Sequence, residues 1–129
     1  MTEWRLVIHG IPRTKKTSNV LAKAGSRPVI LPSEAWRRWR DVAEVRRIYP
    51  LPWSPPKLWV NCCALFYRDA KRGDAVGFYQ GLADLMEHRG LVLNDSQIVS
   101  WDGSRLLIDK QHPRVEITLT SVELPEVAA

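Results

Sequence analysis

The sequence predicts an α+β fold with two layers, in which a mixed β-sheet carries two main helices packed on one face. Three apolar, β-prone segments at residues 4–10, 58–67 and 115–120 predict strands of the sheet. Two amphipathic helical segments lie between them, which is the pattern of helices covering one sheet. We expect residues 1–129 to form a single domain, with about 123–129 as a flexible tail.

The first part of the chain is expected to contribute one strand and one helix. Trp4–Gly10 is apolar and typical of a strand, and Ile11–Asn19 follows it as a basic loop. Ser33 is a suitable N-cap for a helix that continues through Arg47, because tryptophan and alanine residues recur at helical spacing after it. The proline-rich segment 49–56 predicts a rigid connector, since proline fixes the backbone and lacks the N–H donor.

The second part is expected to contribute a buried strand, the longer helix and the closing strands. The run 58–67 is mostly apolar and predicts the buried strand, and Asp74 stands where the N-cap of the next helix belongs. Apolar residues then repeat at three-to-four spacing up to Gly90, which predicts the end of the helix. Leu91–Leu93 predicts a short apolar strand, and Val115–Thr120 alternates like a half-exposed strand.

Positive charge is concentrated near the start of the chain. The net charge is +5, but the stretch from Arg13 to Arg47 holds ten basic and only three acidic residues, a local charge of +7. Segregated positive charge creates a field that attracts polyanions, so nucleic acid is the favoured partner. The alternative is a solvated helix face with surplus arginine.

Other features argue against membrane, nucleotide and disulfide chemistry. No apolar stretch is long enough to span a bilayer and the N-terminus lacks a signal-peptide layout, so we expect a cytoplasmic protein without a membrane partner. No glycine-rich phosphate-binding motif is present, so no nucleotide cofactor is expected. Cys62 and Cys63 are adjacent and are expected to be small strand residues.

Asp74 and Asp95 are the candidate metal ligands. They lie 21 positions apart, and the intervening helix followed by an apolar run could bring both to the same end of the sheet. A hard cation such as Mg²⁺, for which Mn²⁺ could substitute, takes one or two carboxylates and completes its shell with water and substrate phosphate. Each aspartate also has a structural interpretation, as a helix N-cap for Asp74 and as a turn carboxylate for Asp95.

Basic residues beside this stretch are candidates for contacts with DNA phosphates. Arg13, Lys15 and Lys16 lie in the first loop, and Lys71 and Arg72 directly precede the second helix. Contacts of this kind supply affinity and register but do not read sequence. The alternative is two solvated loops.

Several segments, in this order, resemble the RusA-type Holliday-junction resolvases and their phage-borne relatives. The matching segments are G-I-P-R-T-K-K-T-S, L-P-S-E-A-W-R-R-W, K-R-G-D-A-V-G-F-Y-Q-G-L-A-D-L-M, G-L-V-L-N-D-S-Q-I and P-R-V-E-I. They span most of the chain. The resemblance implies a bacterial or phage-encoded α+β homodimer that binds branched double-stranded DNA and cuts it with Mg²⁺ held by aspartates, in recombination and repair.

The resemblance also assigns roles within the motif. Aligned without gaps, the first and last aspartates of the family fall on Asp74 and Asp95, which it implies are catalytic metal ligands. The family's second aspartate falls on Val76, its asparagine on Gly77 and its lysine on Gln80. This chain therefore lacks one expected carboxylate and the lysine that would stabilise charge on the phosphate in the transition state.

Other side chains could replace these groups. The candidate ligands are Asp102, Asp69 and Asn94, and the candidate positive charges are Arg72 and Arg105. The run W-D-G-S-R-L at 101–106 is either a variant feature of the site or a β-turn, because Asp-Gly is a frequent turn pair. Two functions follow: a Mg²⁺-dependent, structure-selective DNA endonuclease, or a catalytically impaired module that binds DNA junctions.

Overall fold

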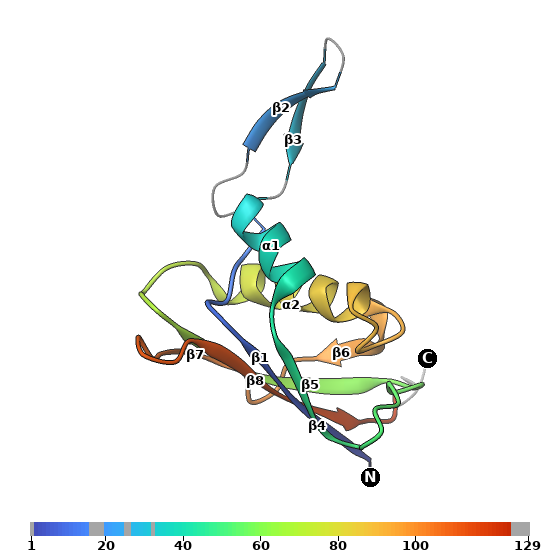
Figure 1. The fold of residues 1–129 in the computed structure, drawn as a ribbon. Coiled ribbons are helices and arrows are strands. Elements are labelled where there is room, and N and C mark those ends of the chain that lie inside the picture. Colours follow the sequence, from blue (N-terminus) through green and yellow to red (C-terminus); the bar gives the residue numbers. More distant parts are fainter. Residues whose placement is uncertain (1, 16–19, 25–26, 32, 125–129) are drawn as a thin grey trace, which may run out of the picture.

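The structure is a computed structural model that describes residues 2–15, 20–24, 27–31 and 33–124, with side chains described for 2–15 and 33–124. Within these residues a six-stranded mixed sheet carries two α-helices on one face, which confirms the predicted two-layer α+β architecture (Figure 1). The strands of the sheet are β1 (Glu3–His9), β4 (Val45–Tyr49), β5 (Val60–Arg68), β6 (Ile98–Ser100), β7 (Arg105–Ile108) and β8 (Arg114–Ser121). The helices are α1 (Glu34–Val42), α2 (Ala75–His88) and the short 3-10 helix η1 (Asp95–Gln97).

The sheet is organised around β5 and β8. Its strand order is β4-β1-β8-β5-β6, and β7 also pairs with β5. β8 runs antiparallel to both β1 and β5, whereas β6 and β7 run parallel to opposite ends of β5. Alternate residues of β5 are buried, because one face of this strand packs against the helices and the other face is open.

The core lies between the sheet and α2. Phe66 of β5 and Phe78 of α2 are almost fully buried, and their ring centroids are 5.3 Å apart. Leu82, Leu85 and Met86 are also fully buried, as their three-to-four spacing predicted. This packing fixes which side of α2 faces the sheet, and therefore which side remains available for a site.

Both cysteines lie in β5, as predicted. Cys62 is buried, Cys63 is half-buried, and both are free thiols. Burial raises the pKa of the Cys62 thiol well above its usual value, with a smaller contribution from Cys63. Cys62 therefore behaves as a small apolar core residue.

Helix α1 is shorter than predicted. The prediction of a helix through Arg47 was wrong: α1 ends at Val42, and residues 45–49 form β4, which pairs antiparallel with β1. Ala43 already has an extended backbone, and the β-branched residues of β4 gain a strand partner that a continued helix would not offer. The arginines at 46 and 47 consequently lie on an edge strand instead of on a helix.

The predicted strand at Leu91–Leu93 was also wrong. Gly90 has a φ of +69°, and the backbone N–H groups of Leu91 and Val92 donate to the carbonyl of Met86 at 2.8 and 3.4 Å. This is the hydrogen bonding of a helix C-terminus closed by a left-handed glycine. Leu91 and Val92 are buried because the chain turns back under α2, not because they belong to the sheet.

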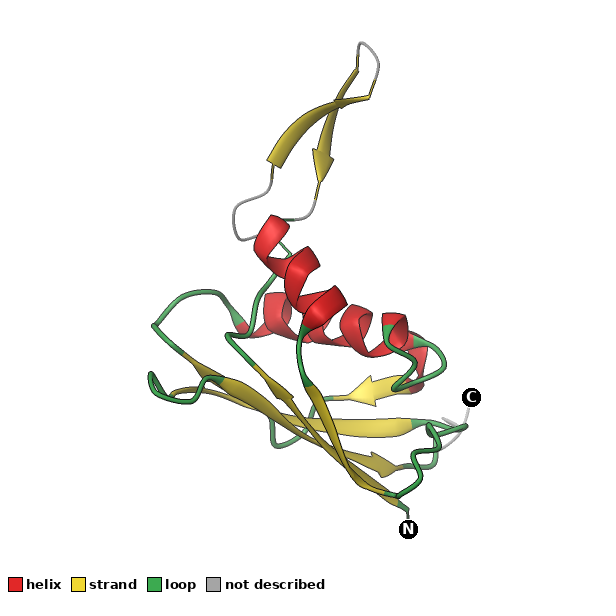
Figure 2. Cartoon of the chain, in the orientation of Figure 1, coloured by secondary structure: helices red, strands yellow, loops and turns green. Residues whose placement is uncertain are grey.

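Three further features complete the fold. An unpredicted antiparallel hairpin of β2 (Val20–Ala24) and β3 (Arg27–Leu31) extends beyond α1, away from the sheet (Figure 2). The proline-rich connector contains neither helix nor strand over 50–56, as predicted. Of the tail predicted at 123–129, residues 125–129 lie outside the described residues. No helix in the described ranges has the length and apolar character needed to cross a membrane.

Candidate active-site cavity

An open cavity of about 530 Å³ lies along the flank of α2, beside η1 and β6. Its lining combines an apolar and aromatic wall with charged and amide side chains. The lining residues are Lys15, Val76, Tyr79, Gln80, Ala83, Asp84, Asp95, Ile98 and Trp101. The charged members are one lysine and two aspartates, so the lining carries a formal charge of −1 and is suited to a cation.

Helix α2 supplies a stripe of side chains to this cavity. Val76, Gln80 and Asp84 recur every four residues and therefore lie on one side of the helix. Val76 and Gln80 are the positions at which the family resemblance expects an aspartate and a lysine. Asp84, one turn further along, was not among the predicted site residues, although its spacing of four from Gln80 was a signal that could have identified it.

Two glycines allow the first loop to cross α2 closely. A Cβ atom added at Gly81 would lie 2.9 Å from the carbonyl oxygen of Arg13 and 3.0 Å from Nε1 of Trp36. A Cβ atom at Gly77 would lie 3.2 Å from Cγ2 of Thr14. The absence of side chains at these two positions allows the loop to lie against the helix.

This crossing places Lys15 in the cavity. Its ammonium group forms an ion pair with Asp84 and lies 4.9 Å from the ring centroid of Trp36. The carbonyl of Lys15 accepts a hydrogen bond of 3.3 Å from the backbone N–H of Ser33, the N-cap of α1. Lys15 is thus a basic residue that lines the same cavity as Gln80, whereas the sequence had offered Arg72 or Arg105 as the substitute positive charge.

Asp95 enters the cavity from η1. A capping box holds this turn in place. The side-chain oxygen of Gln97 accepts hydrogen bonds from the backbone N–H groups of Leu93 and Asn94, at 2.7 and 3.0 Å. The backbone N–H of Asp95 donates to Oε1 of Glu87 at 2.9 Å. Within the described part of the chain, however, the Asp95 carboxylate has neither a hydrogen-bond nor an ion-pair partner. A charged group that the fold does not otherwise use is therefore presented to the cavity.

Asp74 has a different position. It caps α2, as its structural interpretation predicted, and its Oδ1 accepts a hydrogen bond of 2.8 Å from the backbone N–H of Gly77. Asp74 does not line the cavity. Glu87, which holds the backbone of Asp95, lies about 20 Å further along the axis of α2, at a rise of 1.5 Å per residue. The predicted pair of Asp74 and Asp95 is therefore not brought together in this cavity.

The proposed substitute ligands also lie outside the cavity lining. Asp69 forms an ion pair of 2.7 Å with Arg72. The side-chain oxygen of Asn94 accepts from the backbone N–H of Ser96 at 2.9 Å and so caps η1. Asp102 lies in the turn after β6, where Asn61 bonds both its backbone N–H and its carbonyl. Among the described residues, no group of three or more His, Cys, Asp or Glu side chains is arranged to hold a metal.

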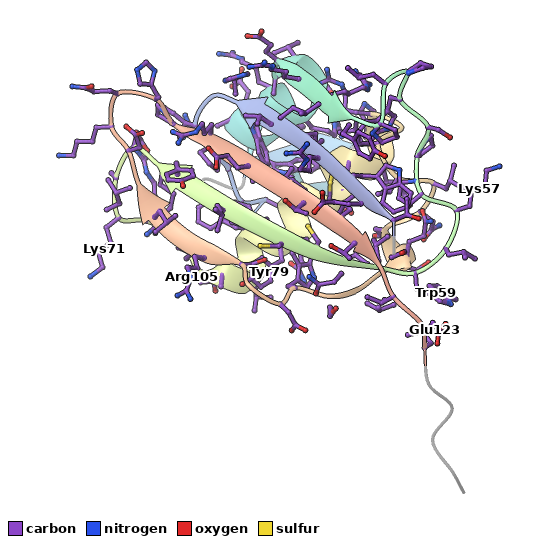
Figure 3. The ribbon with its side chains drawn as sticks, turned by 90° about the horizontal axis from the view of Figure 1, so that it is seen from below. Lys57, Trp59, Lys71, Tyr79, Arg105 and Glu123 are labelled. Atoms are coloured by element: carbon purple, nitrogen blue, oxygen red, sulfur yellow. The ribbon has the colours of Figure 1, made fainter. Side chains whose placement is uncertain are left out.

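The predicted phosphate-binding residues are dispersed. Arg13 lines a separate hollow beside α1, and Lys16 lies outside the described residues. Lys71 and Arg105 are exposed at the end of the sheet opposite Trp59 and Glu123 (Figure 3). Lys15 is therefore the one predicted basic residue that the structure brings into the cavity among those it describes.

The aromatic wall of the cavity was not predicted. Tyr79 and Trp101 stack with ring centroids 4.5 Å apart and an interplanar angle of 5°. Trp101 precedes the turn at residues 102 and 103, so the run W-D-G-S forms a turn whose first residue faces the site. The sequence had offered a β-turn as one interpretation of this run. The stack of Trp101 on Tyr79, 22 positions earlier, depends on tertiary packing and has no local signal.

No protein-family model and no curated protein matches the sequence. An α+β fold hosts many unrelated activities, so the fold alone does not define what this cavity does.

Proposed function

We propose that the protein is a Mg²⁺-dependent endonuclease acting on branched DNA such as Holliday junctions. The observation that carries the proposal is an open cavity lined by two aspartates and a lysine, one of the aspartates without a partner among the described residues. The concentration of positive charge between Arg13 and Arg47 supports a polyanionic substrate. The ordered motifs that resemble RusA-type resolvases support branched DNA as that substrate.

The cavity lining includes the carboxylate and amide groups that a magnesium site with few protein ligands would use. Mg²⁺ is commonly bound by one or two carboxylates and completed by water and substrate phosphate. Asp95 and Asp84 would hold the ion, and the exposed Gln80 amide lies on the same stripe of α2. When bound, the ion would polarise the scissile phosphate and activate a water molecule.

Lys15 would have two functions in this arrangement. In the absence of a cation it neutralises Asp84 through their ion pair. A cation bound by Asp84 and Asp95 would take over that neutralisation, and the lysine ammonium would then be available to a phosphate oxygen. Lys15 would thereby stabilise the charge that develops on the phosphate in the transition state.

A second function, a catalytically impaired module that binds junctions, is favoured by a specific observation. Val76 occupies the position of an expected carboxylate, lines the cavity and is 61% exposed. An apolar residue there lowers the negative charge available to a metal while leaving a DNA-binding surface intact. This alternative keeps the same substrate but predicts binding without cleavage.

We further propose that the protein acts as a cytoplasmic homodimer, which is the assembly that the resemblance implies. Exposed apolar side chains support a protein partner: Tyr49, Leu51, Leu58 and Trp59 lie at or near the proline-rich connector and are 40–71% exposed. Large exposed apolar side chains of this kind are compatible with a protein interface. Light scattering of the purified protein would measure the mass directly, and a monomer at all concentrations would refute the dimer.

The function is tested with a labelled synthetic four-way junction in Mg²⁺, Mn²⁺ or EDTA. The wild-type protein is expected to nick the junction in either metal and not in EDTA, and Asp95→Asn and Asp84→Asn are each expected to lower the rate. Asp102→Asn serves as the matched control, because this aspartate is close in sequence and exposed but does not line the cavity. Tight binding without nicking in both metals would establish the junction-binding module, and absence of binding at low salt would refute both functions.

A further inference from the structure

Three aromatic rings form a series that runs from the core to the cavity. Phe66 is buried in β5, and its ring centroid lies 6.0 Å from that of Tyr79, with the rings tilted by 35°. Tyr79 in turn stacks on Trp101 at 4.5 Å. Trp101 is the outermost ring of the series, is partly exposed and lines the cavity. Tyr79 thus covers one face of the Trp101 indole, and the partly exposed ring lines the margin of the candidate active site.

The position of Trp101 is fixed by side-chain hydrogen bonds around the turn that follows it. Asn61 of β5 accepts from the hydroxyl of Ser100 at 2.6 Å and from the backbone N–H of Asp102 at 2.8 Å. Ser104 bonds β5 from the other side of the turn, donating to the carbonyl of Cys62 at 3.0 Å and accepting from Ala64 at 2.9 Å. Trp101 is therefore held from both flanks, which is the support that a preorganised binding residue requires.

The turn itself is adapted to this close approach to β5. Gly103 has a φ of +86°, a conformation that residues with a side chain rarely adopt, and an added Cβ atom would lie 3.1 Å from Sγ of Cys63. The backbone N–H of Ser104 donates to the carbonyl of Trp101 at 3.1 Å and closes the turn. These contacts fix the turn in a geometry that presents the ring of Trp101 to the cavity.

We propose that Trp101 is a stacking platform for one unpaired nucleobase of the bound DNA. This inference rests on the proposed function and adds to it a feature of the substrate that the cavity recognises. An aromatic face accepts any base, because every base has a flat π surface. The cavity also contains the ammonium group of Lys15, which suits the phosphate of the same strand, and the apolar side chain of Val76.

The platform gives a physical basis for a preference for branched DNA. In a continuous duplex each base is already stacked and paired, so moving one into the cavity carries a cost of unstacking. At a branch point bases are less well stacked, and extraction of one of them costs less free energy. A cavity that needs an unpaired base therefore favours junctions without reading their sequence.

The test uses a four-way junction carrying 2-aminopurine at the branch point, bound in EDTA so that cleavage cannot occur. Trp101→Leu removes the aromatic face and keeps an apolar side chain against Tyr79, and Trp101→Phe restores an aromatic face. Tyr67→Leu is the matched control, because Tyr67 of β5 is another half-buried aromatic residue and does not line the cavity. Thermal unfolding of each variant confirms that it is folded.

Trp101→Leu is expected to weaken junction binding roughly tenfold, the effect of losing one stacked base, and to abolish the quenching of 2-aminopurine fluorescence. Trp101→Phe and Tyr67→Leu should stay within roughly threefold of the wild type, well below the loss of one stacked base. The dependence of affinity on salt should not change, since no charge is removed. If Trp101→Leu binds the junction with the affinity of the wild type and quenches 2-aminopurine equally, the platform is overturned but the nuclease proposal stays intact. Failure of the wild-type protein to bind the junction would instead overturn the proposed function.

Discussion

Asp74 at the start of α2 and Asp95 beyond its end make different interactions. At the start of the helix, the Asp74 carboxylate accepts the N–H of Gly77, and the fold needs it there as a cap. Beyond the end of the helix, Asp95 is held through its backbone by Glu87, and its carboxylate has no partner within the described residues. A cap satisfies an orphan N–H of the helix, whereas a carboxylate left exposed in a cavity is available for chemistry. The position of a carboxylate in a motif therefore says less about its role than the bonds it already makes.

The sharpest test of this difference compares cleavage by Asp74→Asn and Asp95→Asn. Asparagine can still cap α2, so Asp74→Asn should nick the junction within roughly threefold of the wild-type rate, because both caps are of similar strength. Asp95→Asn removes a proposed metal ligand worth several kcal/mol in the transition state, so its rate should fall roughly a hundredfold or more. Single-turnover rates in Mg²⁺ measure both. A folded Asp74→Asn protein that no longer cleaves would place the metal at the start of the helix.

The middle of α2 joins these two ends, and Gly81 is its most constrained position. An alanine methyl there would meet the carbonyl oxygen of Arg13 at 2.9 Å, so the first loop would have to move away from the helix. Overpacking of this kind costs about 1–3 kcal/mol. Urea unfolding should show that loss in Gly81→Ala. Gln80→Ala, at an exposed position of the same helix, should leave stability within about 0.5 kcal/mol of the wild type.

Gly81→Ala also tests how Lys15 reaches the cavity. If the close crossing of loop and helix positions Lys15, then Gly81→Ala should weaken its ion pair with Asp84 and lower the rate of cleavage beyond what the change in stability explains. Lys15→Met provides the comparison, since it removes the charge without disturbing the crossing. Equal cleavage by the wild type and by a folded Gly81→Ala protein would show that the crossing serves stability alone.

A smaller effect is expected where Asp74 acts as a cap. Asp74→Ala should lower the free energy of unfolding by about 1 kcal/mol, because the N–H of Gly77 loses its acceptor. Asp74→Ser should recover most of that loss without restoring a carboxylate. Urea titration of the three proteins separates the cap from the charge. Equal destabilisation by alanine and serine would mean that the carboxylate, and not the hydrogen bond, stabilises the start of α2.

The elements that sequence periodicity predicted best are those whose pattern is local. The core strand β5 and helix α2 follow from alternation and from three-to-four spacing, and the cap at Asp74 follows from residue type. Residues 45–49 were predicted as helix because helical spacing continued past Val42, but the free edge of β1 decides their structure. Leu91–Leu93 was predicted as a strand because a short buried loop and a short strand are equally apolar.

The candidate site could be predicted only in part for a similar reason. Asp95 was predicted and lines the cavity, whereas Asp84 was not predicted, because an aspartate in the middle of an amphipathic helix is equally typical of a solvated helix face. The stack of Tyr79 on Trp101 and the crossing that brings Lys15 to Asp84 depend on contacts between segments far apart in the chain. No local pattern records such contacts, so they require the tertiary structure.

The smallest expected effect concerns the C-terminal end of α2, where His88 lies 3.2 Å from Asp41 of α1. The hydrogen bond from Arg40 holds the pKa of Asp41 below its ordinary value of 3.8, with Coulombic attraction to Arg40 and His88 adding to it. A lowered pKa in the folded state means that ionised Asp41 stabilises the fold above about pH 4, and that this contribution is lost as the pH falls through the folded pKa. Asp41→Asn should therefore melt slightly below the wild type at pH 6, and the difference should diminish as the pH falls below 4. It should also shrink in high salt, because the pair of Arg40 and Asp41 is partly exposed to solvent. A difference in melting temperature that persists unchanged at pH 2 would show that packing, and not the carboxylate charge, links α1 to this end of α2.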